Sequence, residues 1–431
     1  MVIFSTANVS PTSTIVSWKC SAPAKGILFF KKANSTLDWE SHYSPYDSEI
    51  HAFTLEGLTS DLEYLYQVYC GTIGFATSFI QSFKTLPPND FLSNINGTKG
   101  IWIFGGIGSS GNPISQVDVY DPINSVWHSS VTSIPSARAF SIIISHKSKI
   151  YVMGGMTKSS NGTWTAVSTV EEYNPSSNSW RTMNSMPVNL QGGVGISVEN
   201  EIYLVGGTTT SDMTTGTILN TVLKFKPELG STGTWSSYTS LTSIFARVDL
   251  SGCGIEGSLF LTGGRLYSDG NPYATSDAYI PSANATSSVN EASISSARHG
   301  AAYACYKPLP TDVYPDDPAG LLIAGGSTGS NISQPVTSIS PANLFDYYKT
   351  GSSTNSIQAG PVIPVSLYYS SMEISYEKRK AYLFGGASAI NLPQDTVYSI
   401  GLENPVGGPW EELNVKMPVA RFAHKAVIIN R

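Results

Sequence analysis

A glycine pair recurs six times along this chain, each time at the end of a short apolar run such as IWIFGG, IYVMGG or AYLFGG. The first glycines of the pairs are Gly105, Gly154, Gly206, Gly263, Gly325 and Gly385. Consecutive pairs therefore lie 49, 52, 57, 62 and 60 residues apart. A repeated unit of about 50 residues buries its faces by stacking on its neighbours. The spacing predicts six stacked units.

The apolar runs are short and rich in Val, Ile, Tyr and Phe, and glycine, proline, serine and threonine separate them throughout. This composition is typical of β-strands joined by turns. No long segment shows the 3.6-residue apolar period of a helix. The chain is therefore predicted to be all-β.

Two further elements accompany the glycine pairs. The first two pairs are followed by VDVYDPINSVW and VEEYNPSSNSW, and the segments PSARAF, TSIFARVD, SSARHG and PVARFA precede further apolar runs. Together these elements resemble the kelch repeat over residues 98–431. The resemblance implies a six-bladed β-propeller in which each blade is a four-stranded sheet. The third and sixth repeats lack the Ala-Arg pair, and the fifth lacks the tryptophan.

The two ends of the repeat region complement each other. The first repeat opens directly at IWIFGG without an inner strand, whereas HKAVIIN near the C-terminus is an inner strand with no repeat after it. We expect the C-terminal strand to pair beside IWIFGG and to close the ring, which removes an open sheet edge. Deletion of residues 421–431 is then expected to unfold the propeller.

Residues 1–87 contain short alternating runs such as STIVSWKCSA and YLYQVYCGT, and residues 88–97 form a proline-containing linker. The first segment resembles a fibronectin type III β-sandwich, with Trp18 as its buried tryptophan and Tyr64 as its corner tyrosine. It is also similar to the small N-terminal domain of purple acid phosphatases. Because a propeller follows it, none of the metal chemistry of that family is expected here.

Four cysteines are present. Strand alternation lets Cys20 and Cys70 face the sandwich core from opposite sheets, so a disulfide between them is plausible, with two buried free thiols as the alternative. Cys253 and Cys305 lie on inner strands of the fourth and fifth blades. We expect them to be small buried residues rather than a bridge.

Composition narrows the partners. The net charge is −6, only 13% of residues are charged, and no run of lysine or arginine occurs, which argues against nucleic acid. No apolar stretch approaches the length of a membrane span and no signal peptide is visible, so membrane insertion is not expected. The low charge and abundant Ser, Thr, Gly and Tyr favour an extracellular, cell-surface or virion-surface location.

Catalytic and metal-binding patterns are weak. The six histidines show no compact ligand spacing with one another or with cysteine. The segment EASISSARH resembles the iron motif of plant specifier proteins at Glu291 and His299, but Ser295 replaces the middle carboxylate ligand. The adjacent Tyr-His pair of kelch-like copper radical oxidases is absent. The sequence therefore predicts no catalytic residues, no metal and no cofactor.

One face of the propeller is predicted to gather the repeat arginines and aromatic loop residues. Arginines in such positions suit acidic peptides, and loop aromatics suit peptides or sugars. The alternative is that each arginine bonds backbone carbonyls within the repeat. The candidate ligand-binding residues are Arg138, Arg247, Arg298, Arg421, Trp164, Tyr267 and Tyr273.

These inferences predict a non-enzymatic binding and assembly protein, a component of a cell or virion surface that contacts other proteins or surface glycans within a larger assembly. The sandwich would serve as the attachment module and the propeller as the recognition module. Two alternatives remain open. One is a propeller enzyme of the copper radical oxidase or glycan-active class, and the other is an intracellular kelch scaffold that binds an acidic peptide.

Overall fold

The computed structural model divides the chain into two compact units, Met1–Asp90 and Phe91–Arg431. It describes residues 2–9, 13–36, 38–59, 62–71, 80–85, 92, 95, 97–198, 200–211, 216–237, 246–255, 257–266, 270–281, 285–287, 292–307, 319–331, 333, 339–350, 355–403 and 405–429.

The first unit is a five-stranded antiparallel sheet whose strands change partners. Its strands are β1 (Val2–Val9), β2 (Thr14–Lys32), β3 (Glu40–Leu55), β4 (Glu63–Cys70) and β5 (Gln81–Lys84). The first half of β2 pairs with β1 and the end of β3, whereas its second half pairs with the start of β3 and with β4. Alternate residues of both halves therefore meet in one core.

The core of the first unit is built around Trp18, which is fully buried. A disulfide joins Cys20 on β2 to Cys70 on β4, with their Cα atoms 5.8 Å apart. The Tyr64 hydroxyl accepts a hydrogen bond from the Thr59 amide at 2.9 Å. The resemblance to a fibronectin type III domain, and the domain limits drawn from it, stay predictions.

The second unit consists of six four-stranded antiparallel sheets, which confirms the predicted propeller blades. From the inner strand outward, blade 1 is β35 (Lys425–Ile428), β6 (Ile101–Phe104), β8 (Gln116–Asp121) and β9 (Val126–Ser133). Blade 2 is β10 (Ile142–His146), β11 (Lys149–Met153), β14 (Val170–Asn174) and β15 (Ser179–Met183), and blade 3 is β16 (Val194–Val198), β17 (Glu201–Val205), β18 (Leu223–Lys226) and β19 (Thr234–Ser237). Blade 4 is β20 (Ser251–Ile255), β21 (Ser258–Thr262), β22 (Ser276–Ile280) and β23 (Ala285–Ser287). Blade 5 is β24 (Ala302–Tyr306), β25 (Gly320–Ala324), β26 (Phe345–Lys349) and β27 (Ser356–Ala359), and blade 6 is β28 (Ser371–Ser375), β29 (Lys380–Phe384), β32 (Val397–Gly401) and β33 (Glu411–Glu412).

The described residues of the unit also form three short two-stranded sheets. They pair β12 (Met156–Lys158) with β13 (Trp164–Ala166), β30 (Ala387–Ala389) with β31 (Leu392–Pro393), and β34 (Arg421–Phe422) with β7 (Ile107–Gly108).

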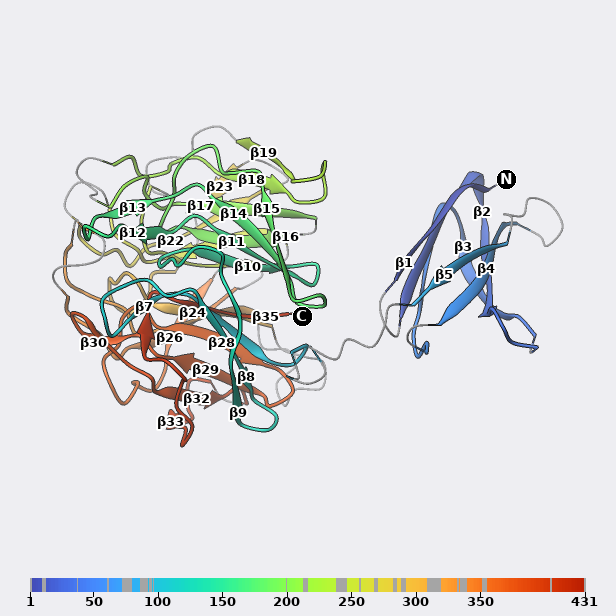
Figure 1. The fold of residues 1–431 in the computed structure, drawn as a ribbon. Helices are drawn as coiled ribbons and strands as arrows, with labels where there is room; N and C mark the ends of the chain where they lie inside the picture. Colours follow the sequence, from blue (N-terminus) through green and yellow to red (C-terminus); the bar gives the residue numbers. More distant parts are fainter. Residues whose placement is uncertain are drawn as a thin grey trace. The chain divides into compact units, whose positions relative to one another are not determined.

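The C-terminal strand closes the ring, as predicted. Strand β35 pairs with β6, so that Lys425 lies opposite Phe104 and Ile428 opposite Ile101. The inner strands contact one another in the cyclic order β10, β16, β20, β24, β28, β35 and back to β10. Figure 1 shows β35 among these inner strands. We call the space that the six inner strands enclose the channel.

The glycine pairs are explained by close approach of the backbone. Gly105 and Gly106 have φ values of 60° and 97°, and a Cβ on Gly106 would lie 2.7 Å from the Phe422 carbonyl oxygen. The other five pairs also have positive φ at both positions. A side chain there would be strained and would push away the segment that leads into an inner strand.

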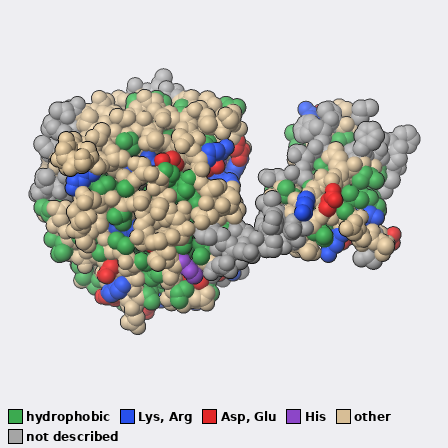
Figure 2. Space-filling view, viewed as in Figure 1, with side chains coloured by type: hydrophobic (Ala, Val, Ile, Leu, Met, Phe, Trp, Pro, Cys, Tyr) green, Lys and Arg blue, Asp and Glu red, His purple; other side chains and the backbone are tan. Residues whose placement is uncertain are grey.

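Aromatic residues fill the contacts between blades. Tyr173 and Trp180 of blade 2 pack with tilted rings whose centroids are 4.9 Å apart, and the Trp180 ring meets Phe104 of blade 1 edge to face at 6.3 Å. The repeated tryptophans thus serve the stacking of blades. The face drawn in Figure 2 carries only small scattered groups of charged side chains, in keeping with the 13% charged composition.

Candidate functional site

A ring of backbone hydrogen bonds ties the six blades together at one end of the channel. In each blade, one residue just before the inner strand has a positive φ, between 49° and 66°. Its amide donates to the carbonyl of the corresponding residue of the preceding blade, with N to O distances of 2.7–3.2 Å. The six residues are Phe140, Gly192, Asp249, Gly300, Tyr369 and Ala423.

Large and small residues alternate around this ring. Phe140, Asp249 and Tyr369 take every second position, and Gly300 occupies the position beside Tyr369 because a Cβ there would lie 2.6 Å from the tyrosine ring. The Phe140 and Tyr369 rings meet edge to face at 5.1 Å. We call Phe140, Asp249 and Tyr369 the plug. Phe140 and Tyr369 are bulky residues at positive φ, which is a strained conformation. The backbone hydrogen bonds of the ring to which they belong hold them in it.

Asp249 is the buried anionic centre of the plug. Its carboxylate accepts hydrogen bonds from Arg265 Nε at 3.0 Å and from the Tyr369 hydroxyl at 2.5 Å, and His299 Nδ1 lies 3.7 Å away. Burial favours the neutral acid, but Arg265, His299 and Tyr369 outweigh it, so the pKa of Asp249 is lowered. Burial also lowers the pKa of His299, which keeps this imidazole neutral.

Away from the plug, the channel widens into a cavity of about 440 Å³. All six inner strands contribute to its wall, and its volume is within the range of small-ligand sites. A smaller cavity of about 90 Å³ lies beneath the plug and shares Tyr303 and Lys425 with the larger one. The polar and aromatic residues of the larger cavity include Lys425, Tyr303, Glu373 and His146.

Lys425 places a cation where the two cavities meet. Its Nζ lies 3.5 Å from the centroid of the Tyr303 ring, which is a cation–π contact. No carboxylate pairs with this amine within the part of the chain that the structure describes. The ammonium group is therefore available to an anionic ligand in the cavity.

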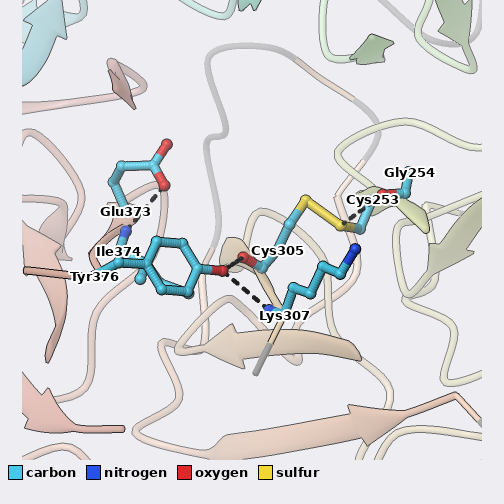
Figure 3. Close-up of a disulfide and its surroundings, with 7 residues drawn as sticks. All are labelled: Cys253, Gly254, Cys305, Lys307, Glu373, Ile374 and Tyr376. Atoms are coloured by element: carbon cyan, nitrogen blue, oxygen red, sulfur yellow. Dashed lines mark hydrogen bonds between the residues drawn. A yellow bond between two sulfur atoms is a disulfide. The ribbon is translucent and has the colours of Figure 1, made fainter. Parts of the chain in front are cut away.

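Glu373 and His146 add groups that can transfer protons. Glu373 is only 6% exposed, and one of its carboxylate oxygens accepts the Ile374 amide at 2.9 Å (Figure 3). Burial lowers the pKa of His146, and Lys147 lowers it further, so the imidazole is neutral near pH 7. His146 Nδ1 lies 2.8 Å from Ser197 Oγ, and its Nε2 has no hydrogen-bond partner among the described residues.

The four predicted arginines are buried within the blades, at most 1% exposed. Arg421 Nη1 donates to the carbonyls of Gly105 at 3.2 Å and Gln116 at 3.1 Å, and its Nη2 pairs with Asp118. The pairs in blades 2, 4 and 5 are Arg138 with Glu171, Arg247 with Asp277, and Arg298 with Asp346. This is the structural role that the sequence left open. Burial lowers the pKa of Arg138 to about 10, still well above neutral pH.

A carboxylate accompanies the arginine in every blade that has one. In blades 3 and 6 the arginine position holds Leu190 and Leu367, and the carboxylate position holds Leu223 and Tyr398. This co-occurrence within one chain was visible in the sequence and points to an internal ion pair rather than to a ligand site.

The two predicted aromatic residues that the structure describes, Trp164 and Tyr273, do not line the channel cavity. Trp164 is half-buried, with Lys158 Nζ 5.5 Å from its ring centroid. Tyr273 is half-buried, and its backbone carbonyl accepts the Arg298 amide at 3.2 Å. Tyr267 lies outside the described residues.

Cys253 and Cys305 form a disulfide, contrary to the expectation of two buried thiols (Figure 3). They lie on the inner strands of neighbouring blades, β20 and β24, with their Cα atoms 5.6 Å apart. This distance is set by the stacking of blades 4 and 5, which spacing along the sequence could not measure.

Sequence reasoning also missed the cavity residues. The signal was present, because Lys425 and Glu373 are the charged residues of the inner-strand runs KAVI and SMEIS. A charged side chain on an innermost strand has only the channel in which to remain hydrated.

Comparisons with known proteins show what the blades are similar to. A sequence model of the N-acetylneuraminate epimerase family matches residues 88–237. The N-acetylneuraminate epimerase of Haemophilus influenzae (strain PittEE) is 31% identical over 143 residues, 32% of this chain. Kelch-like protein 23 of Pongo abelii is 26% identical over 174 residues, 40% of this chain and 28% of that protein. The solved structure of YjhT is similar in fold, with a TM-score of 0.57 and 16% identity over 74% of this chain and 95% of that one.

The second unit is a kelch-repeat propeller. The alignment spans only 37% of the length of the Haemophilus relative. The prediction that the kelch-repeat protein is not an enzyme is wrong, since the matched family model and this relative point to a sialic-acid-active enzyme family. Within the described residues, no helix is long and apolar enough to cross a membrane, and no three His, Cys, Asp or Glu side chains form a metal-binding group.

Proposed function

We propose that the kelch-repeat propeller is a glycan-active enzyme that epimerises a carboxylated sugar of the N-acetylneuraminate type in the 440 Å³ channel cavity. The observation that carries this proposal is the Lys425 ammonium, which lies in the cavity wall without a carboxylate partner among the described residues. The similarity to N-acetylneuraminate epimerases supports the substrate class.

Each cavity residue has a distinct role in this proposal. The Lys425 ammonium binds the sugar carboxylate, since a charge-assisted hydrogen bond is stronger than a neutral one. The Tyr303 ring packs against the apolar face of the sugar. Epimerisation needs a group that accepts a proton and a group that returns one. The Glu373 carboxylate is assigned the accepting role, and the carboxylic acid that it becomes returns the proton. The neutral His146 imidazole is assigned a hydrogen bond to the sugar through Nε2.

The test is proton NMR exchange spectroscopy of N-acetylneuraminate in the presence of the full-length protein. It measures how fast the proton signals of the two epimers exchange with each other, and hence how fast the epimers interconvert. Glu373→Gln keeps the shape of the side chain but removes the base, and we expect it to slow the exchange by about 100-fold. Lys425→Met removes the ammonium that binds the sugar carboxylate in this proposal. Lys416→Met is its matched control, because Lys416 lies on the surface and pairs with Glu412 at 2.6 Å. Exchange no faster with the wild-type protein than without it would refute the proposal.

Attachment to a cell or virion surface and membership of a larger assembly stay predictions from the sequence. Copurification from the source organism, with mass spectrometry of the associated proteins, measures them independently of the enzyme assay.

A further inference from the structure

The Cys253–Cys305 disulfide lies in the wall of the cavity that Lys425 and Glu373 also line. Cys253 is fully buried, whereas Cys305 is half-buried and is the half of the bridge that the channel can reach. It connects β20 to β24, two inner strands from neighbouring sheets that are not hydrogen-bonded to each other. No other disulfide occurs in the second unit. The covalent link between blades 4 and 5 thus lies at the wall of the proposed substrate site.

The wall around this disulfide is built from small residues. Gly252 and Gly254 flank Cys253 on β20, and Ala304 precedes Cys305 on β24. The glycines are needed because blade 3 packs closely against β20. A Cβ on Gly254 would lie 2.7 Å from the Ile196 side chain of that blade. Small residues leave room for the cavity but provide few side-chain contacts that could fix its width.

The disulfide is also connected to the proposed anion site. Cys305 lies two residues after Tyr303 on β24, so both side chains point to the same side of the strand and both line the cavity. The Tyr303 ring in turn contacts the Lys425 ammonium at 3.5 Å. A displacement of β24 would therefore move the aromatic surface on which the ammonium rests.

We infer that the Cys253–Cys305 disulfide positions the residues of the substrate cavity. A small dithiol that enters the channel reduces this disulfide, and the reduction weakens binding of the sugar acid. In the opening step, one thiolate of the dithiol attacks the sulfur of one cysteine and forms a mixed disulfide with it, while the Cys253–Cys305 bond breaks and the other cysteine leaves as a thiolate that takes up a proton. The second thiol of the dithiol then closes the oxidised dithiol ring and releases the first cysteine. Two electrons and two protons pass from the dithiol to the protein. This inference rests on the proposed function for the identity of the ligand, the sugar acid. The effect of reduction on β20 and β24 does not depend on that function.

The first unit provides a matched control. Cys20 and Cys70 lie in its apolar core, 0% and 8% exposed, and take no part in the channel. In Cys20→Ala/Cys70→Ala the channel disulfide is the one remaining disulfide, so that reduction reports on the channel alone. This variant should bind N-acetylneuraminate as tightly as the wild type under oxidising conditions.

The experiment treats Cys20→Ala/Cys70→Ala with dithiothreitol and follows Cys253 and Cys305 by thiol alkylation and mass spectrometry. Titration calorimetry then gives the Kd for N-acetylneuraminate before and after reduction. We expect the Kd to rise by about tenfold or more, and bound N-acetylneuraminate to slow the alkylation. Equal Kd values in the two redox states would overturn the inference.

Hydrogen exchange separates this inference from the proposed function. On reduction, amide exchange should speed up in β20 and β24 but stay unchanged in β10, on the other side of the channel. If N-acetylneuraminate does not bind even the oxidised protein, the proposed substrate is wrong, whereas faster exchange confined to β20 and β24 still supports the positioning role. Unchanged exchange in both strands, or faster exchange throughout the propeller, would contradict it. Cys253→Ala/Cys305→Ala should reproduce the reduced state without a reductant.

Discussion

Replacing Arg421 by methionine should weaken closure of the propeller, because this residue ties the C-terminal strands to blade 1. The change removes the cationic partner of Asp118, whose side chain is fully buried, and the donor to the carbonyls of Gly105 and Gln116. Leaving one charge of a buried ion pair unpaired costs about 3–5 kcal/mol. For a unit of about 340 residues, an unfolding entropy of about 0.7 kcal/mol/K converts this loss into a Tm decrease of about 4–7 °C.

Scanning calorimetry measures this decrease, and two further variants identify its cause. Lys416→Met removes an ion pair whose side chains are 45% and 51% exposed, so its Tm should shift by less than about 1 °C. Arg421→Met/Asp118→Leu removes the orphaned charge and should recover part of the loss. If Arg421→Met lowered Tm by no more than Lys416→Met does, the arginine would not hold the ring closed, and the reasoning would be refuted.

Two other substitutions test the channel ring and its histidine. Gly300→Ala should lower the free energy of unfolding by about 1–3 kcal/mol more than Gly111→Ala does. Both glycines have φ near 65°, but only a Cβ at Gly300 would meet a neighbour, the Tyr369 ring at 2.6 Å. Equal losses in urea titrations would show that this contact is unimportant. Burial holds the pKa of His424 well below 6.5, so below pH 6.5 the unfolded chain takes up a proton that the folded one does not, and stability falls as the pH falls. His424→Leu should make this fall shallower by about 1.4 kcal/mol per pH unit, and an unchanged slope between pH 5 and 6.5 would contradict the assignment.

The fold could be predicted because each repeat carries its own local constraints. Gly105 and Gly106 need positive φ, and Gly106 needs space for the Phe422 carbonyl. Because every blade has the same backbone conformation at this point, every repeat contains a glycine pair. Closure by β35 followed from counting strands in the first and last repeats. Neither inference required knowledge of distances between blades.

The site could be predicted only in part, since its residues meet across blades. Lys425 and Tyr303 are far apart in sequence and come together only because blades 1 and 5 face the same channel. The Cys253–Cys305 bridge depends in the same way on the spacing of two inner strands. The repeated arginines were predicted to form a cationic face, but their guanidinium groups form ion pairs with carboxylates inside the blades.

The most direct test of the proposed site compares the Kd of N-acetylneuraminate with that of its uncharged methyl ester, for the wild type and for Lys425→Met. If Lys425 binds the sugar carboxylate, the wild type should prefer the acid by about 10- to 100-fold, and the variant should bind both compounds about as weakly as the wild type binds the ester. If the wild type binds acid and ester equally, or if Lys425→Met keeps the preference for the acid, the carboxylate does not bind at Lys425 and the central claim fails.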